Sequence, residues 1–203
     1  MNNAFKDMNE IPVPTWNWLK VNSTDLKQNF PPVGEYVKNP QTGVTTEGVD
    51  LSSIEQADNY SGAYLPEPGA SEAFMDYMRG HRNSGYFIRI AKGRVIEEPI
   101  FVVYTLDEQS PVLVDDIFIL AEEGSKATVV IHYSANGAGP AFHSGMTRLH
   151  VQDGAELQLI KIQMLSDEDS HVDHVAAAAG VRSKVKVLLA ELGAKESVTN
   201  CNI

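Results

Sequence analysis

The densest group of side chains able to do chemistry lies in residues 166–174, with the sequence Ser-Asp-Glu-Asp-Ser-His-Val-Asp-His. Four carboxylates there accompany His171 and His174. Imidazole and carboxylate ligands suit Fe(II), Mn(II) or Zn(II). The two histidines are three residues apart, however, and side chains at that spacing in a β-strand point to opposite faces. They are candidate metal ligands only if the backbone turns between them. A solvated loop that enters a strand is the simpler interpretation.

Cys201 is the only cysteine in the chain. Its thiolate could bind iron or sulfide. No second cysteine forms a CxxC pair with it, so an incidental or buried thiol is the simpler interpretation. The sequence therefore predicts no catalytic residue and no cofactor-binding residue. Its candidates for a metal site are His171, His174 and Cys201.

Two further groups could take part in acid–base chemistry. Asp115 and Asp116 are adjacent carboxylates within a strand-like segment. Neighbours in a strand point to opposite faces, which does not suit a general acid and base. We expect this pair at a corner or an exposed edge, and we expect surface or stacking roles for His132 and His150.

The elements that must position these residues repeat along the second half of the chain. An acidic turn with Gly124 precedes one strand-like segment, and a similar turn with Gly154, 30 positions later, precedes another. A third, looser unit starts at Gly180. A turn and a strand repeated every 20 to 30 or so residues is typical of a β-solenoid, because one coil buries too little apolar surface to be stable alone. We therefore predict an all-β fold, a right-handed parallel β-helix.

The strands are predicted from runs rich in Val, Ile, Phe and Tyr. Lysines alternate with Val185, Val187 and Leu189, which indicates one buried face and one wet face. At Leu159 and Ile160 the apolar phase slips by one residue, which predicts a bulge or a coil corner. The expected strands cover residues 87–90, 99–105, 112–120, 128–133, 146–152, 157–164, 172–179 and 184–192.

The first part of the chain has a different character, and we predict an N-terminal arm over residues 1–84 and a β-helix core over residues 85–203. Trp16 and Trp18 are expected to anchor the arm by burying large side chains. Residues 31–70 show no clear strand and are interpreted as an extended or partly disordered linker.

Residues 71–80 fit a short helix. Ser71 is the expected N-cap, Phe74, Tyr77 and Met78 fall on one face, and Gly80 is the expected end.

Composition limits the possible partners. The chain of 203 residues has a formal net charge of -11, which disfavours binding to nucleic acid or to an anionic membrane. It shows no apolar signal core, no membrane-length apolar run and no pair of cysteines for a disulfide. We expect a soluble protein of the reducing cytoplasm.

Four segments together resemble one protein family. Residues 12–22 are similar to the P-x-P-x-W-R-x-L-K-x-[NT] element near the start of SufD-type proteins, and residues 93–102 to the segment in which Pro-Ile opens a core strand. Residues 122–133 and 151–157 resemble the next two coils. The similarity covers roughly residues 5–200, and its order and spacing identify the chain as a member of the SufB/SufD family.

The resemblance implies a SufD-like scaffold of the SUF iron–sulfur cluster assembly system, with no enzymatic activity of its own. It implies a right-handed parallel β-helix that acts with a SufB-type partner and the SufC ATPase, with the iron–sulfur cluster built in the assembled complex. Family members continue past residue 203, so the resemblance covers their N-terminal part and transfers no cluster-assembly residue. Exposed coil ends favour a homodimer or a heterodimer through the β-helix.

Two other functions stay open at this point. A carbohydrate-active β-helix enzyme, such as a polyuronate lyase or hydrolase, fits the β-coils, but no carboxylate pair is placed by its spacing on one coil face. A simple metal-binding module would rest on His171 and His174.

Overall fold

The computed structural model describes residues 5–6, 8, 23–26, 31–38, 41–42, 47–59 and 72–203. Strands dominate this part of the chain, and α1 is its one α-helix. None of the described helices is both long enough and apolar enough to cross a membrane. The elements are β1 (Gln41–Thr42), β2 (Val49–Ser53), the 3-10 helix η3 (Ile54–Asn59), α1 (Glu72–His81), β3 (Ser84–Ile90), β4 (Ile100–Leu106), β5 (Val112–Ala121), β6 (Lys126–Ala135), β7 (Phe142–Val151), β8 (Glu156–Met164), β9 (Ser170–Ala179), β10 (Lys184–Glu191) and β11 (Glu196–Asn202).

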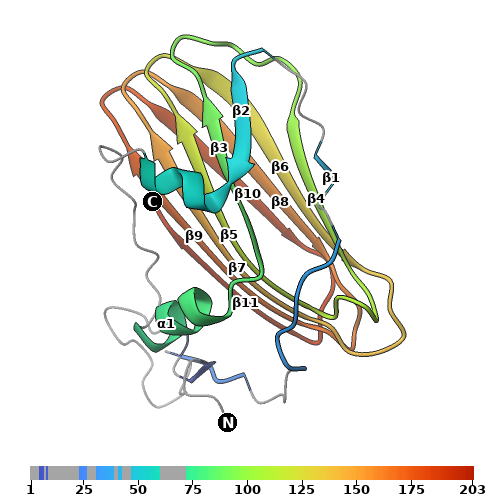
Figure 1. Cartoon of the computed structure of the whole chain (residues 1–203). Coiled ribbons are helices and arrows are strands. Elements are labelled where there is room, and N and C mark those ends of the chain that lie inside the picture. Colours follow the sequence, from blue (N-terminus) through green and yellow to red (C-terminus); the bar gives the residue numbers. More distant parts are fainter. Residues whose placement is uncertain are drawn as a thin grey trace.

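From β3 onward the chain winds as a parallel β-solenoid (Figure 1). Successive strands alternate between two sheets, a five-stranded sheet of order β1-β4-β6-β8-β10 and a six-stranded sheet of order β11-β9-β7-β5-β3-β2. Each strand from β3 to β9 is hydrogen-bonded in parallel to the strand one turn later. The predicted all-β fold, a parallel β-helix, is confirmed. The eight predicted strands correspond to β3 through β10.

The coil corners explain why the turns stack in register. Gly93, Gly124 and Gly154 have φ values of 69°, 66° and 68°, in the left-handed region that glycine adopts without strain. The amide of Gly124 donates to the carbonyl of Asp153 over 3.0 Å, which links one corner to the next. Arg182 takes the corresponding position in the following corner with a φ of 58°.

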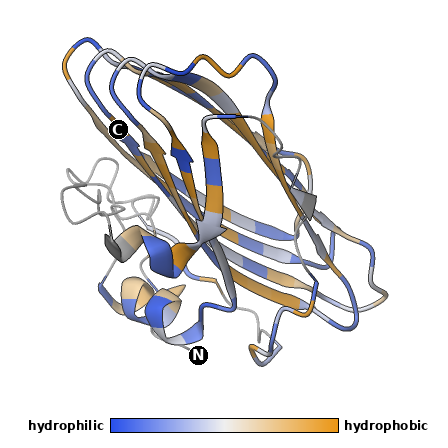
Figure 2. Cartoon of the chain, turned by 45° about the horizontal axis from the view of Figure 1, so that its top comes forward, coloured by the Kyte–Doolittle hydropathy of each residue, from blue (hydrophilic) through white to orange (hydrophobic). Residues whose placement is uncertain are grey.

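The main core lies between the two sheets. Along each strand, side chains alternate between this interior and the outside, and Figure 2 shows the hydrophobic and hydrophilic segments alternating along the strands. The predicted inward residues Val185, Val187 and Leu189 pack against this core. The predicted slip in β8 is wrong, because its burial alternates without interruption and its pairing with β6 has no bulge. Lys161 therefore points into the interior.

A second apolar layer covers the outer face of the six-stranded sheet. The predicted helix is confirmed as α1, and Phe74, Tyr77 and Met78 are its buried residues. Phe5 packs edge-on against Phe74, Tyr77 and the β7 residue Phe142. The helix continues through the expected end at Gly80 to His81. The predictions for Ser71, Trp16 and Trp18 fall outside the described residues.

Residues 31–70 differ from the prediction that they hold no strand. β2 pairs with β3 in an antiparallel register, and β1 pairs in the same way with β4. After β2, η3 lies against Phe87 and Phe118, whose rings stack 5.4 Å apart on the outside of the six-stranded sheet. β1 and β2 thus pair with β4 and β3, the first strands of the solenoid. Strands this short show too little alternation of apolar and polar residues to be predicted from the sequence. The domain boundary between residues 84 and 85 stays a prediction.

Candidate functional site

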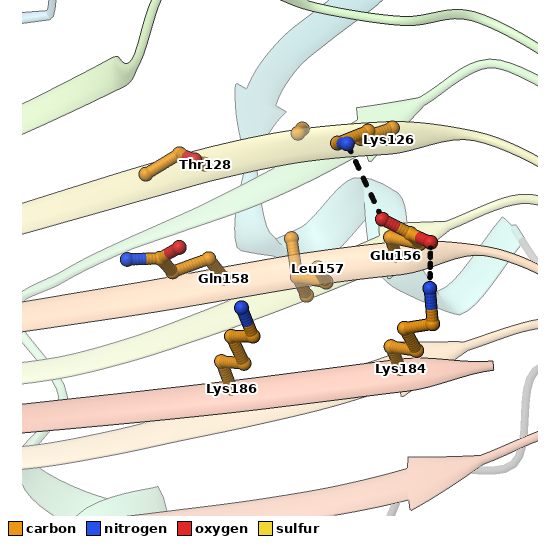
Figure 3. A pocket seen from close by; sticks show the side chains of 8 residues that line it. Lys126, Thr128, Glu156, Leu157, Gln158, Lys184 and Lys186 are labelled. Carbon is orange, nitrogen blue, oxygen red and sulfur yellow. Dashed lines mark hydrogen bonds and ion pairs between the residues drawn. The ribbon is translucent and has the colours of Figure 1, made fainter.

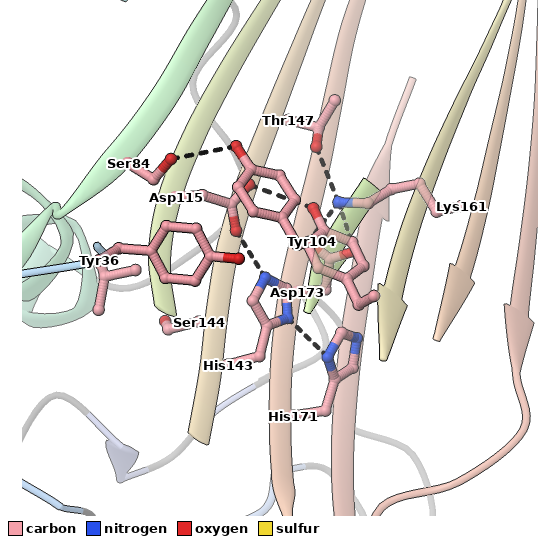
Figure 4. A network of polar contacts seen from close by, with 12 residues as sticks. Tyr36, Ser84, Tyr104, Asp115, His143, Ser144, Thr147, Lys161, His171 and Asp173 are labelled. Carbon is pink, nitrogen blue, oxygen red and sulfur yellow. Dashed lines mark hydrogen bonds and ion pairs between the residues drawn. The ribbon is translucent and has the colours of Figure 1, made fainter. Parts of the chain in front are cut away.

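A chain of polar side chains runs through the interior between the sheets (Figure 4). Asp115 on β5, His143 on β7 and His171 on β9 form its centre, and their side chains are at most 1% exposed. His143 and His171 are register partners on neighbouring strands. Because a parallel solenoid places successive coils directly above one another, residues about one coil apart in sequence meet here.

Gly145 makes room for this arrangement. It lies in register between Asp115 and Asp173 on the adjacent strands. A Cβ atom at this position would come within 2.8 Å of Asp173 Oδ1 and of Cε1 of the His143 ring. A side chain at position 145 would therefore displace the Asp173 carboxylate or the His143 ring.

The hydrogen bonds of this interior polar chain are continuous from Tyr133 to His171. Tyr133 donates its hydroxyl proton to Asp115 Oδ2 over 3.1 Å, and His143 Nε2 lies 2.6 Å from Asp115 Oδ1. The Nδ1 atoms of His143 and His171 are 2.7 Å apart. When His143 Nε2–H donates to the Asp115 carboxylate, Nδ1 of a neutral His143 ring must accept, so His171 Nδ1–H is the donor. The chain therefore has one consistent direction of proton donation, from His171 toward Asp115.

Burial shifts the pKa values of the groups in this interior polar chain. Removal from water raises the pKa of Asp115 to about 6, although Lys161, Tyr133 and His171 favour its charged form. Burial also lowers the pKa of His143 well below its ordinary value and raises that of Tyr133 well above it. His143 is therefore neutral at pH 7, which agrees with one of its nitrogens acting as an acceptor.

The interior polar chain ends beside Glu191 of β10, near the last coil. His171 Nε2 is 3.5 Å from Glu191 Oε2, at ion-pair distance. Ser197 and Thr199 on β11 donate to the same carboxylate over 2.8 and 3.0 Å. Burial opposes ionisation of Glu191, but His171 and the two hydroxyl groups outweigh it and lower its pKa to about 2. A carboxylate that stays charged thus lies at the β10–β11 end of the interior.

A buried ion pair lies beside the chain. Lys161 Nζ is 2.7 Å from Asp173 and donates to Thr147 Oγ1 over 2.8 Å. The ammonium group also lies 5.2 Å from the centre of the Tyr133 ring. Buried charges need partners of this kind, because an unpaired charge away from water is strongly destabilising.

The structure separates the three candidate metal ligands. His171 points into the interior, whereas His174 lies on the outer face of the sheet, with its ring centre 4.4 Å from that of Phe74. The two rings cannot share one ion, as their spacing in a strand indicates. Cys201 on β11 is exposed, although partial burial of its thiol raises the pKa of that group. Among the described residues, no group of three or more His, Cys, Asp or Glu side chains could hold a metal ion.

The prediction that Asp115 and Asp116 occupy a corner or an exposed edge is wrong. Both are buried in the middle of β5. They do face opposite sides, because Asp115 bonds to His143 inside and Asp116 pairs with Arg148 outside, where Nη2 and Oδ2 are 2.6 Å apart. Because β5 pairs with β3 on one side and β7 on the other, both carboxylates lie on a central strand and not at an edge of the sheet.

Sequence reasoning did not single out His143 as a site residue. A signal was present, because Asp115, His143 and His171 follow one another at intervals of 28 residues. This interval is close to the coil repeat of 30 positions between Gly124 and Gly154. Polar residues that recur at the coil period inside strand-like segments would have predicted an interior polar chain.

Comparison with known proteins gives one family. Residues 104–203 match the family model described as SUF system FeS cluster assembly, SufBD core domain. No curated protein and no solved structure is similar enough to count as a match. The matched residues run from Tyr104 within β4 through β11 and include Asp115, Tyr133, His143, His171 and Glu191 of the interior polar chain.

Proposed function

Residues 104–203 of this chain belong to the SufB/SufD family, and from this premise we propose that the chain is a SufD-like scaffold, acting in the cytoplasm. The SufBD core domain indicates a part in iron–sulfur cluster assembly by the SUF system. In the proposed role the chain performs no catalysis. It works with a SufB-type protein and with the SufC ATPase, which supplies the ATP hydrolysis, and the cluster is cargo of the assembled complex.

The observation that carries this proposal is the match of residues 104–203, which hold the coils from β4 to β11, to the SufBD core domain. β10 and β11 are the outermost strands of their sheets, and no strand within the described residues pairs with their outer edges. Unpaired N–H and C=O groups along such an edge favour pairing with a strand of another chain. A SufB-type partner with its own parallel coils would continue both sheets, and the ionised Glu191 would lie at that junction.

The two alternative functions find less support in the geometry. A glycoside-cleaving site needs two carboxyl groups that flank one bond. Asp115 and Asp116 are buried and face opposite sides of the sheet. A metal-binding module on His171 and His174 would need rings on one face, and the rings lie on opposite faces.

Co-expression with a SufB-type protein and the SUF ATPase tests the proposal. We expect light scattering on the purified material to give the mass of a stoichiometric complex that contains this chain. Failure to associate with either protein would contradict the proposed function.

Two proline variants then locate the contact. N–H groups alternate between the two edges of a strand, so one of Asn200→Pro and Cys201→Pro removes an outer-edge donor and the other a donor to β9. The variant that keeps the unfolding midpoint of the parent should bind the SufB-type partner at least ten-fold more weakly. Parental affinity in that variant would exclude the β11 edge as the contact.

A further inference from the structure

One buried ring nitrogen of His171 has no hydrogen-bond partner among the described residues. Because Nδ1–H of His171 donates to His143, a neutral His171 ring carries a lone pair and no proton at Nε2. This Nε2 atom lies 3.5 Å from a carboxylate oxygen of Glu191, so two acceptors face each other there. A proton on Nε2 would convert their repulsion into a charge-assisted contact. The end of the interior polar chain therefore has a place for one additional proton.

The rest of the interior polar chain is arranged so that a proton can move along it (Figure 4). The two histidine Nδ1 atoms are 2.7 Å apart, and Nε2 of His143 is 2.6 Å from Oδ1 of Asp115. Both pairs of atoms are already at the distance that proton transfer requires. Tyr133 donates to the other carboxylate oxygen of Asp115, which leaves Oδ1 free to receive a proton.

We propose that His171, His143 and Asp115 form a proton relay, which takes up one proton at the β10–β11 end and stores it on Asp115. The incoming proton binds Nε2 of His171. The Nδ1 proton of His171 then moves to Nδ1 of His143, and the Nε2 proton of His143 moves to Oδ1 of Asp115. One proton enters and the Asp115 carboxyl group gains one. The direction of donation along the relay is reversed, and each of its ring nitrogens has a partner.

Glu191 provides the entrance to the relay. Its side chain is 30% exposed, whereas the three relay side chains are at most 1% exposed. Ser197 and Thr199 hold its carboxylate in place beside His171. This carboxylate can therefore accept a proton from water and pass it to Nε2 of His171.

The groups around the relay favour storage on Asp115. Burial raises the pKa of Asp115 to about 6 and lowers that of His143 well below its ordinary value, so the proton does not remain on the middle ring. The other ionisable side chains of the described interior near the relay are Tyr36, Tyr86, Tyr104, Lys161, Asp173 and Cys201. Burial raises the pKa of the three tyrosines and of the thiol, so they stay neutral, and the lysine and the aspartate neutralise each other. The relay should therefore fill as the pH falls through about 6.

The fold itself does not require a polar chain at this place. Leu113 on β5 is the register partner of His143 and is buried in the same interior, so an apolar side chain fits there one coil earlier. The relay is a property of this chain alone and does not depend on the proposed function. It makes the β10–β11 end of the solenoid a donor and acceptor of protons.

Side-chain ¹⁵N NMR of the full chain between about pH 8 and pH 5 tests the relay, because the ring nitrogen signals identify the histidine tautomer. We expect His143 to change from the Nε2–H to the Nδ1–H tautomer. The midpoint should lie near pH 6 and coincide with protonation of Asp115 in ¹³C spectra. A fixed His143 tautomer across this range, as a purely structural network predicts, would overturn the proposal. An additional proton that stays on His171 would overturn it as well.

Glu191→Gln tests the entrance, because it removes the carboxylate and keeps the size of the side chain. Exchange of the His143 ring N–H with water should slow by about ten-fold or more. Glu156→Gln is the matched control, since Glu156 is 35% exposed and pairs with Lys126 and Lys184 on the outer face of the five-stranded sheet (Figure 3). It should leave the exchange rate unchanged, and unfolding midpoints show whether both variants are folded. Parental exchange in folded Glu191→Gln would contradict this route of proton entry.

Discussion

At the scale of single residues, the fold holds several ionisable groups away from water. His174 is the simplest case, because neither ring nitrogen has a hydrogen-bond partner and Phe74 covers the ring. Burial lowers its pKa to about 4. The unfolded chain, with an ordinary histidine pKa near 6.5, therefore binds a proton that the folded chain does not. Stability from this group is present above about pH 6.5 and is lost as the pH falls toward 4.

Replacement of His174 by phenylalanine tests this origin of acid sensitivity. The wild-type chain should lose up to about 3 kcal/mol from this ring between pH 6.5 and 4, and His174→Phe should remove that loss. Urea unfolding at several pH values measures it. The raised pKa of Asp115, about 6, changes stability with pH in the opposite sense, but Asp115 is present in both proteins. The difference between the two pH profiles of unfolding free energy therefore reports on His174 alone. An identical pH dependence in the two would contradict the account.

The ion pair of Lys161 and Asp173 makes a second residue-scale prediction. Lys161→Met should cost about 3–5 kcal/mol of unfolding free energy, because it leaves a buried carboxylate without its cation. Asp173→Leu should cost a similar amount for the converse reason. The double variant should recover much of the loss, because both charges are gone. Additive losses measured by denaturant unfolding would show that the two charges do not stabilise each other.

At the scale of elements, the coil corners determine how strands follow one another. Arg182 adopts a left-handed φ of 58° where three other corners have glycine. A non-glycine residue in this region costs about 1 kcal/mol, and glycine avoids that cost. We expect Arg182→Gly to stabilise the chain by roughly 0.5–1 kcal/mol.

Gly124→Ala is the matched experiment. A Cβ atom at Gly124 would meet no atom within 4 Å, so the change tests the backbone angle alone. It should destabilise the chain by about 1 kcal/mol in the same unfolding assay. Opposite signs for the two variants are the expected outcome. Destabilisation by both would mean that Arg182 contributes contacts that outweigh its strain.

The elements themselves were largely predictable, because alternation and corner residues act locally. Phe74, Tyr77 and Met78 predicted the buried face of α1, and the alternating lysines predicted the inner face of β10. Lys161 could not be placed in the same way. Its inward position depends on Asp173 and Thr147, which belong to other strands, and no local pattern contains those partners.

The candidate site was predictable only in part for the same reason. The opposite orientation of His171 and His174 follows from strand geometry and is confirmed. The contact between His143 and His171 depends on the exact register of two coils, which the sequence alone leaves undetermined. Adjacent carboxylates in a strand-like segment predict a corner or an exposed edge, and the buried partners of Asp115 reverse that expectation.

At the scale of the whole molecule, the solenoid combines a closed interior with an open end. Its interior holds the polar chain, and its β10–β11 end offers strand edges beside Glu191. These edges support the proposed pairing with a SufB-type protein. The interior polar chain runs toward this end.

Cluster transfer tests the scaffold role itself most directly. A SufB-type protein, the SUF ATPase, iron, a sulfide source and ATP would be supplied to an apo-ferredoxin, and cluster acquisition would be followed by its visible absorbance. We predict that adding this chain increases the rate several-fold, and that the edge-blocking proline variant of β11 removes the increase. An equal rate with and without this chain would contradict its role in iron–sulfur cluster assembly.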